Sequence, residues 1–250
     1  MNDKLKVIML SQSDYKDNDA MIQTLSLEKG ILTFIAKGLL KSESKNASAC
    51  LPFSESELTY DEKEGSSLQI LHSATIINSH RLLREDLSKQ TVMTVISELV
   101  SQLLKENYDP KLLNEVYKVY TQCMSTVETS DKHAHTLTFF LVCALGWFGV
   151  EPHVDECTLC GDTQINSISM EEGGFICSNC QKEIQSQLFS SDFLYAFRIV
   201  NKVTSDNFSR YLNYNAPDKT LIDFLYQFMQ YHTNISLKSW VFLEKWSIIN

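Results

Sequence analysis

Four cysteines in two closely spaced pairs constrain this chain more than any other feature. The first pair lies in Cys157-Thr158-Leu159-Cys160, and the second, after sixteen residues, lies in Cys177-Ser178-Asn179-Cys180. Each Cys-x-x-Cys pair can bend as a tight knuckle, and the intervening loop can bring four thiolates into one tetrahedral shell around Zn²⁺. A shell of four sulfurs leaves no open position for water, so we expect one structural, non-catalytic zinc ion per chain.

The residues around the two pairs fit such a zinc module. Gly161 directly follows the first pair, and Gly173-Gly174 supplies a flexible turn just before the second. Two disulfides, a redox Cys-x-x-Cys site and a chance arrangement are the alternatives, but single redox motifs do not come as matched pairs. The pattern therefore predicts how the segment at about 153–184 folds, and it does not by itself give a function.

Composition is that of an ordinary globular chain. The 250 residues are 44% hydrophobic and 21% charged, which allows one large domain or two to three small ones. The other three cysteines, Cys50, Cys123 and Cys143, are expected to be buried free thiols in a reducing compartment. The N-terminus lacks the basic start and long apolar stretch of a secretory signal, and no apolar run reaches the roughly 20 residues of a membrane helix. We therefore expect a cytoplasmic protein with no membrane partner and no small-molecule substrate.

The net charge of −9 is unevenly distributed. Residues 151–184 hold seven Asp and Glu residues and a single Lys, so the cysteine segment carries most of the excess. An acidic total argues against a protein that coats nucleic acid with its whole surface, but it permits a local basic patch.

The first 80 residues predict a small β-barrel. Short β-rich runs alternate with turn signals, and five of them have the size and strand count of an OB-like barrel. These runs are residues 5–10, 21–27, 31–36, 53–60 and 68–77. The polar stretch 38–49 is expected to be a long loop between the third and fourth strands.

Beyond residue 80 the apolar period changes to three or four residues, which predicts helices. We expect one long amphipathic helix over 81–106, ended before Pro110, and further helices over 111–124, 133–148, 193–203 and 219–232. Ser191-Asp192 and Pro217-Asp218 supply start signals for the last two. The predicted fold class is α+β, with an OB-fold, DNA-binding domain at 1–80 and an α-helical domain at 81–250 that carries the zinc knuckle.

No catalytic motif is visible. The chain has no phosphate-binding loop, dinucleotide fingerprint, Gly-x-Ser-x-Gly elbow or His-Glu-x-x-His, and eight Gly leave little room for one. His133 and His135 lie two residues apart on a predicted helix, so they point to different faces and are expected to be capping or surface residues. We expect a protein that is not an enzyme.

A basic stretch in the barrel suggests a nucleic-acid site. Within residues 29–45 four cations stand against a single acid, Glu43; they are Lys29, Lys37, Lys41 and Lys45. OB-like barrels bind single strands along strands and adjoining loops, where cations neutralise phosphates and aromatic rings stack on bases. Phe34 and Phe53 flank the loop as candidate rings. The alternative is a loop that only solubilises the surface, with both rings in the core, and the sequence favours neither.

Further candidate DNA contacts lie at the two ends of the barrel segment. Arg81 and Arg84 follow its last predicted strand, and Lys4 and Lys6 lie at its other end. Lysine and arginine neutralise phosphates wherever they are exposed along the path of the strand. We expect Arg81 and Arg84 to contribute to DNA binding.

The order of these parts resembles one known family. In the barrel the motifs are Val7-Ile8-Met9-Leu10, Asp17-Asn18-Asp19-Ala20, Glu28-Lys29-Gly30, Ala36-Lys37-Gly38 and Leu51-Pro52-Phe53. In the second half they are Gly-Trp-Phe-Gly-Val-Glu-Pro at 146–152, the two cysteine pairs with their glycines, and Leu237-Lys238-Ser239. Together these motifs span nearly the whole chain and resemble the bacterial recombination mediator family RecO.

The resemblance implies a non-enzymatic DNA repair protein of the bacterial cytoplasm, associated with the nucleoid. It implies binding to single- and double-stranded DNA, annealing of complementary strands, and partnership with RecR. It also implies recognition of the C-terminal tail of the single-strand-binding protein and help in loading RecA in the RecF pathway.

The chain departs from the family pattern in two places. The family commonly has a strongly basic run after Ala-Lys-Gly, whereas residues 39–45 here contain fewer cations and Glu43. DNA affinity is therefore expected to be weaker or shared with RecR. All four zinc cysteines are present, although some family members lack them. The alternative function is a zinc-stabilised protein-interaction scaffold whose partners handle DNA.

Overall fold

A computed structural model describes residues 3–62, 65–105 and 108–245 of the protein. Two compact units are present. Unit 1 comprises Met1–Asp131 and Ser239–Glu244, and unit 2 comprises Lys132–Lys238 and Lys245–Asn250. This grouping places the helices before residue 132 with the barrel. The expected domain boundary at 80/81 stays a prediction, because a grouping by contacts does not test which segments fold independently.

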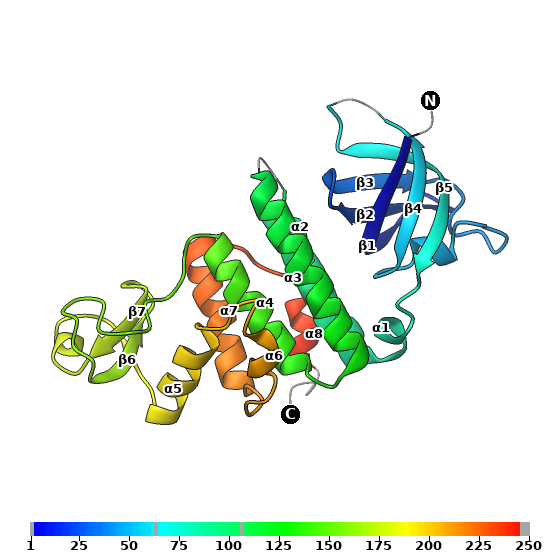
Figure 1. Ribbon diagram of the computed structural model, residues 1–250. Helices are drawn as coiled ribbons and strands as arrows, with labels where there is room; N and C mark the ends of the chain where they lie inside the picture. The colour runs from blue at the N-terminus through cyan, green and yellow to red at the C-terminus, as the bar shows by residue number, and fades with distance from the viewer. Residues whose placement is uncertain (1–2, 63–64, 106–107, 246–250) are drawn as a thin grey trace. The chain divides into compact units, whose positions relative to one another are not determined.

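Unit 1 begins with five strands that close into a barrel (Figure 1). The strands are β1 (Asp3–Tyr15), β2 (Asp19–Ser26), β3 (Gly30–Ala36), β4 (Glu55–Asp61) and β5 (Leu68–Asn78). Their order around the barrel is β1-β2-β3-β5-β4, and β1 pairs with β4 to close it. All pairs are antiparallel except β3 with β5, which run parallel over residues 33–35 and 68–70. The predicted OB-like barrel is confirmed.

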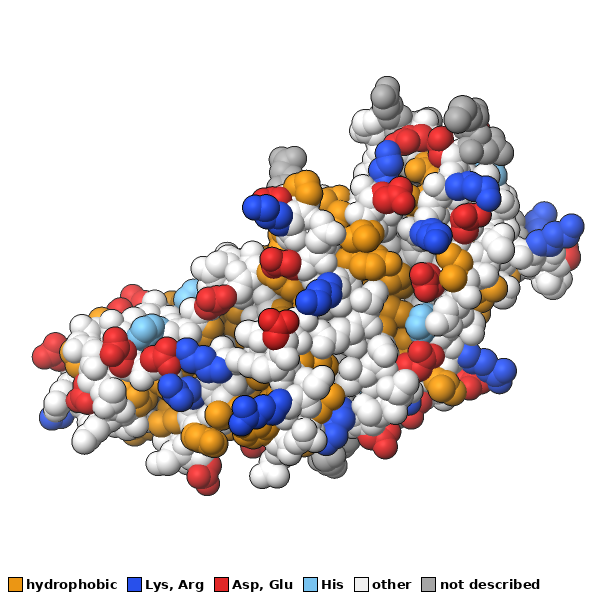
Figure 2. Space-filling model, in the orientation of Figure 1, with side chains coloured by type: hydrophobic (Ala, Val, Ile, Leu, Met, Phe, Trp, Pro, Cys, Tyr) orange, Lys and Arg blue, Asp and Glu red, His pale blue; other side chains and the backbone are white. Residues whose placement is uncertain are grey.

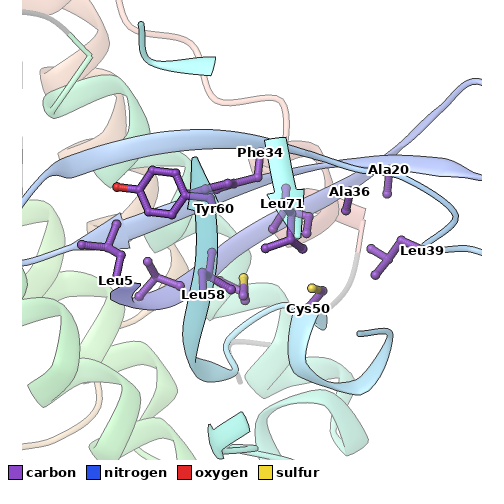
Figure 3. Close-up of a cluster of buried hydrophobic side chains, with 12 residues drawn as sticks. Leu5, Ala20, Phe34, Ala36, Leu39, Cys50, Leu58, Tyr60 and Leu71 are labelled. Carbon is purple, nitrogen blue, oxygen red and sulfur yellow. The ribbon is translucent and has the colours of Figure 1, made fainter. Parts of the chain in front are cut away.

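Side chains of alternate residues fill the barrel, as the two-residue period of a strand requires. On β1, Leu5 and Val7 are buried while Lys6 between them is exposed. Phe34 of β3 and Tyr60 of β4 meet edge to face, with ring centroids 5.2 Å apart, which is a favoured aromatic geometry. Figure 3 shows these two rings among the aliphatic side chains of the same core.

The helical part of unit 1 comprises α1 (Leu82–Glu85), α2 (Leu87–Leu103), α3 (Pro110–Thr129) and the C-terminal α8 (Trp240–Lys245). The prediction of one continuous helix over 81–106 is wrong at Asp86, whose backbone is extended (φ −116°, ψ 122°). Its Oδ1 accepts a hydrogen bond from the Lys89 N–H at 3.0 Å, so Asp86 is the N-cap of α2. The last predicted residue, 106, lies outside the described residues.

Helix α8 was not expected, because its six residues are too few to show a period. Its first turn is held by another helix: Glu98 Oε2 of α2 accepts hydrogen bonds from the Ser239 N–H at 2.8 Å and from the Ser239 hydroxyl at 2.5 Å. A carboxylate at a helix N-terminus satisfies otherwise unpaired N–H groups and complements the helix dipole. Ser239, the last residue of the Leu237-Lys238-Ser239 motif, therefore joins the start of α8 to α2.

Unit 2 contains α4 (His133–Trp147), α5 (Ser191–Val200), α6 (Phe208–Tyr211) and α7 (Lys219–Thr233). Helix α4 is buried on nearly all sides and packs against α7. The helices predicted near 133, 193 and 219 are confirmed, but the N-cap of α5 is Ser190 rather than Ser191-Asp192. Among the described residues no helix is long and apolar enough to span a membrane.

The remainder of unit 2 is a small three-stranded sheet with the order β7-β6-β8. Its strands are β6 (Ile165–Ser169), β7 (Gly174–Cys177) and β8 (Gln187–Leu188), and a short 3₁₀ helix, η2 (Cys180–Lys182), follows β7. The sheet and η2 carry the second cysteine pair, so this sheet positions half of the predicted metal site.

A close approach at Gly30 gives a test of how the barrel meets the helices of unit 1. Gly30 has φ +65°, and a Cβ there would lie 1.7 Å from the Tyr108 Oη. We expect Gly30→Ala to lower the free energy of unfolding by roughly 2–4 kcal/mol, because left-handed backbone strain adds to overpacking. Urea unfolding measures this loss.

Gly65 provides a matched control. It also has a positive φ, +73°, but no atom lies within 4 Å of its Cβ position. Gly65→Ala should therefore cost only the backbone strain, about 1–2 kcal/mol. Adding Tyr108→Ala to Gly30→Ala should lower the cost of the glycine substitution. Equal losses for the two glycine variants would contradict the close packing of Tyr108.

Candidate metal centre and nucleic-acid loop

The four cysteines gather at one point in unit 2. The sulfur atoms of Cys157, Cys160, Cys177 and Cys180 all lie within 4.8 Å of one another, and those of Cys160 and Cys177 are 3.6 Å apart. A tetrahedron with metal–sulfur bonds of about 2.3 Å has edges of about 3.8 Å, so these separations suit one shared ion. The predicted ligand set is therefore able to hold a metal.

Local backbone geometry shapes both knuckles. In the first, the Gly161 N–H donates to the Cys157 carbonyl at 2.9 Å, and Gly161 has φ +76°, a conformation that glycine adopts without strain. In the second, Cys177 ends β7 and Cys180 begins η2, where the Glu183 N–H donates to the Cys180 carbonyl at 3.0 Å. Each pair is thus bent within four or five residues.

Backbone pairing then brings the two knuckles together. The Thr158 N–H donates to the Phe175 carbonyl of β7 at 2.8 Å, which joins the first knuckle to the strand that leads into the second. The turn at Gly173 has φ +70°, and a Cβ on Gly174 would lie 2.4 Å from the His153 carbonyl oxygen. The predicted glycine turn is confirmed, and the close approach of two backbones explains why glycine stands at 174.

The electrostatics of the thiols favour a cation. Burial opposes ionisation of Cys157, but backbone N–H groups of Cys177, Leu159 and Cys160 lower its pKa to about 6. The pKa of Cys180 is raised, chiefly by its hydrogen bond with the Cys160 side chain, so without a cation Cys180 resists ionisation beside a thiolate at Cys157. A divalent ion that binds thiolate reverses this effect and stabilises all four in the charged form.

An ion-pair cluster fixes the start of the cysteine segment to α5. Asp155 accepts a hydrogen bond from Lys202 Nζ at 2.7 Å and from Arg198 Nη2 at 2.9 Å. The bond from Lys202 is the main cause of the lowered pKa of Asp155. Arg198 Nε also donates to the Val154 carbonyl at 3.1 Å. The metal segment is therefore held by contacts outside its own knuckles.

The predicted DNA-binding cations fall into two groups. Lys37, Lys41 and Lys45 are exposed on the loop after β3, and none of them forms an ion pair within the described part of the chain. Basic side chains gather in Figure 2 where this loop projects from the barrel at the right edge of the view in Figure 1. Elsewhere on the face in view, basic and acidic side chains are interspersed.

The other three cations are already engaged. Lys29 Nζ lies 2.8 Å from a carboxylate oxygen of Glu62, and this hydrogen bond is the main cause of the raised Lys29 pKa. Arg81 pairs with Glu85 one helical turn away. Arg84 Nη1 donates to the Pro52 carbonyl at 2.8 Å. Their contribution to DNA binding stays a prediction, and the carboxylates paired with Lys29 and Arg81 reduce the positive field available to a phosphate.

The two candidate stacking rings belong to the core. Phe34 is 0% exposed and Phe53 is 1% exposed, so neither can reach a base. Phe34 points inward on β3, while the Phe53 N–H donates to the Met9 carbonyl at 2.7 Å and fixes the residue against β1. The stacking interpretation is wrong, because the two-residue period of β3 directs Phe34 into the barrel and Phe53 is buried in the turn before β4.

The loop that carries the three lysines is fastened to the barrel. The Gly38 N–H donates to Asp19 Oδ1 at 2.7 Å, and the side chain of Asn46 bonds the edge of β5. Asp19 and Gly38 belong to two motifs that the sequence shows separately. No local spacing connects them, because their contact depends on the pairing of β2 with β3, in which Ala20 lies opposite Ala36.

One histidine prediction is also wrong. His135 was expected at a cap or on the surface, but it is buried on α4, with Nε2 3.0 Å from the Tyr214 carbonyl oxygen. Burial lowers the pKa of His135, which favours the neutral ring that such a site can hold. His135 therefore serves the core of unit 2.

Replacing one ligand tests the metal centre. We expect Cys177→Ser to lower bound metal below one ion per chain and to lower the melting temperature, because metal coordination contributes directly to folding. Elemental analysis and thermal melting measure the two effects. Cys143→Ser is the matched control, since Cys143 lies on α4, outside the cluster, and it should leave metal content unchanged. A wild-type chain that stays folded with less than about a tenth of an ion would contradict the assignment.

Comparison with known proteins covers nearly the whole chain. The family model described as "Recombination protein O N terminal" matches residues 1–80, and the one described as "Recombination protein O C terminal" matches residues 84–240. The chain is 26% identical to "DNA repair protein RecO" of Oceanobacillus iheyensis over 72% of this chain and 68% of that protein. It is 29% identical to the protein of the same name from Clostridium novyi, over 72% and 69%. The chain therefore belongs to the recombination protein O family of DNA repair proteins.

Proposed function

We propose that this chain is a non-enzymatic recombination mediator that binds single- and double-stranded DNA and anneals complementary strands. The observation that carries the proposal is the fastened loop of an OB-like barrel, on which Lys37, Lys41 and Lys45 are exposed and free of ion pairs among the described residues. Cations at the mouth of such a barrel can neutralise the phosphates of a strand without any base-specific contact. Membership of a DNA repair family supports the same reading.

We propose that the chain acts on DNA in a complex with a partner protein. Three free lysines can neutralise only a few phosphates, and a chain with net charge −9 repels DNA from the rest of its surface. A complex with RecR would supply further cations and hold the strand while RecA is loaded onto DNA coated by single-strand-binding protein. The cytoplasm at the nucleoid is the location that this function requires.

We propose Zn²⁺ as the ion of the cysteine cluster, with a structural role. Four thiolates in tetrahedral order suit zinc, and a closed shell leaves no position at which the ion could act on a substrate. The residues that would hold it are Cys157, Cys160, Cys177 and Cys180. Binding zinc would stabilise the segment and leave DNA contact to the barrel.

A second candidate function is a zinc-stabilised scaffold that contacts proteins while its partners handle DNA. The pairing of Lys29, Arg81 and Arg84 with groups of this chain favours it, because half of the candidate DNA-binding cations are engaged. The two functions differ in whether the chain alone binds DNA through the loop.

The salt dependence of DNA binding separates the two functions. Each neutralised phosphate contributes a slope of about −0.7 to the plot of log K against log salt for a single strand. Changing Lys37, Lys41 and Lys45 together to Ala should therefore flatten the slope by at most about 2 and slow annealing. Fluorescence titration of a labelled single strand at several salt concentrations measures the slope.

Lys105, Lys111 and Lys118, changed together to Ala, form a charge-matched control, because all three are exposed on the helical part of unit 1. This control should leave the slope nearly unchanged. Equal effects of the two triple variants would mean that the loop has no special role. An unchanged slope in the loop variant, with binding restored only when RecR is added, would favour the scaffold.

Recognition of the tail of the single-strand-binding protein, which the family resemblance implies, would need a cationic site. A groove of unit 2 has a cavity volume of about 750 Å³ and lies between α5 and the start of α7. Its lining is mostly apolar and includes Asp192 and Asp218 but no Lys or Arg, so it does not suit an acidic peptide. Arg198 is engaged by Asp155, whereas Arg210 is exposed and has no ion pair among the described residues.

We expect a peptide with the acidic, apolar sequence of that tail to bind at low salt and to lose affinity by about threefold to tenfold in Arg210→Ala, because a carboxylate contact is lost. Fluorescence anisotropy measures the affinity. The peptide with an amidated C-terminus tests whether the free carboxylate is read. Absence of binding by the wild-type chain at low salt would remove tail recognition from the proposal.

A further inference from the structure

The N-terminal end of the basic loop is fixed by a carboxylate. Asp19 Oδ1 accepts a hydrogen bond from the Gly38 N–H at 2.7 Å, directly after Lys37. Gly38 has φ +64°, and its Cβ position lies 3.6 Å from the side chain of Lys41, which therefore runs beside the glycine. The Leu40 N–H donates to the Asn18 carbonyl at 3.0 Å, so the amides of Gly38 and Leu40 both bond to residues at the start of β2 and in the turn before it.

The C-terminal end of the loop is fixed by an amide. Asn46 Nδ2 donates to the His72 carbonyl at 3.4 Å, and Asn46 Oδ1 accepts from the Ala74 N–H at 3.1 Å. Strand β5 needs such a partner, because its pairing with β3 covers only residues 68–70 and leaves its later edge without a neighbouring strand on that side. An amide side chain offers both a donor and an acceptor, so Asn46 substitutes for one residue of a strand.

Between these ends the loop is a run of turns. The Lys41 N–H donates to the Gly38 carbonyl at 3.3 Å, and the Ser44 N–H donates to the Lys41 carbonyl at 3.1 Å. Leu39 is 3% exposed and belongs to the barrel core. The loop therefore has a defined course, unlike a polar loop that only solubilises a surface.

Asp19 is unfavourable for DNA binding on charge alone. Its carboxylate lies beside the residue that follows Lys37, and a negative charge near a phosphate path weakens binding. The hydrogen bond from the Gly38 N–H accounts for an acid at this position, because a charged acceptor forms a stronger hydrogen bond than a neutral one.

We propose that Asp19 and Asn46 are positioning residues for DNA, which hold Lys37, Lys41 and Lys45 in a prepared arrangement. A strand that meets an ordered loop does not bear the entropic cost of ordering it, so each lysine contact contributes more to affinity. This inference rests on the proposed DNA-binding function of the loop and assigns a role to two residues that are not themselves expected to touch DNA.

Three substitutions in the full-length chain test the inference, together with one control. Asp19→Ala and Asp19→Asn remove the same charge, but only the Asn side chain retains an acceptor for the Gly38 N–H. Asn46→Ala removes the second fastening without a change of charge. Asn18→Ala is the matched control, because only the backbone carbonyl of Asn18 bonds the loop. Affinity for a single strand and amide hydrogen exchange are measured for each variant, and thermal melting checks the fold.

We expect Asp19→Ala and Asn46→Ala to weaken binding by about threefold to tenfold, the effect of roughly one lost hydrogen bond. Exchange should quicken at the Gly38 amide in Asp19→Ala and at the Ala74 amide in Asn46→Ala. Asn18→Ala should bind DNA as tightly as the wild type. Asp19→Asn should bind at least as tightly, because it keeps the acceptor and removes a negative charge.

Other outcomes overturn the inference in distinguishable ways. Equal tightening by Asp19→Ala and Asp19→Asn would show that the carboxylate acts only as a repelling charge. Unchanged exchange at Gly38 and Ala74 would show that neither side chain orders the loop. If the triple lysine variant loses DNA affinity while Asp19→Ala and Asn46→Ala do not, the inference alone fails. If the triple lysine variant also binds normally, the proposed function of the loop fails with it.

Discussion

Closure of the barrel is the constraint on which the arrangement of unit 1 depends. A sheet of five short strands has two unpaired edges unless it closes, and here β1 pairs with β4 while β3 pairs with β5. Because β5 lies between β3 and β4, the chain that leaves β3 must cross the end of the barrel to reach β4. That crossing contains the basic loop. The loop therefore occupies a fixed place on the barrel as a consequence of strand order.

Closure also decides which side chains are available to a ligand. Alternate residues of every strand point into the barrel, so Phe34 and Tyr60 meet in its core and cannot reach a nucleic-acid base. The exposed polar residues of the loop are Lys37, Lys41 and Lys45, the acid Glu43, and the serines Ser42 and Ser48. The three lysines suit contact with phosphates more than reading of bases, which agrees with the proposed role of a mediator that handles strands of any sequence.

In unit 2 the cysteine cluster lies in a segment that has little apolar core of its own. The segment around it has only short strands and a small apolar core of Ile176, Cys157 and Cys177, with Ile165, Cys180 and Ile184 partly buried beside it. So few buried side chains stabilise a fold weakly, and a metal shell can supply the missing free energy. The lowered pKa of Cys157 favours the thiolate form that binds a metal ion. The contacts of Asp155 hold the cysteine segment against α5.

The sequence by itself determined the features that depend on neighbours along the chain: five strands from their two-residue period, the main helices from their longer period, and the candidate metal ligands from Cys-x-x-Cys spacing. Tertiary structure alone decided the features that depend on distant partners. Glu98 caps a helix about 140 residues away, and Asp19 holds the Gly38 amide. Burial of Phe53 and pairing of Arg84 belong to the same class. A periodic pattern shows which face of an element is apolar, but it does not contain the register and closure that choose what that face meets.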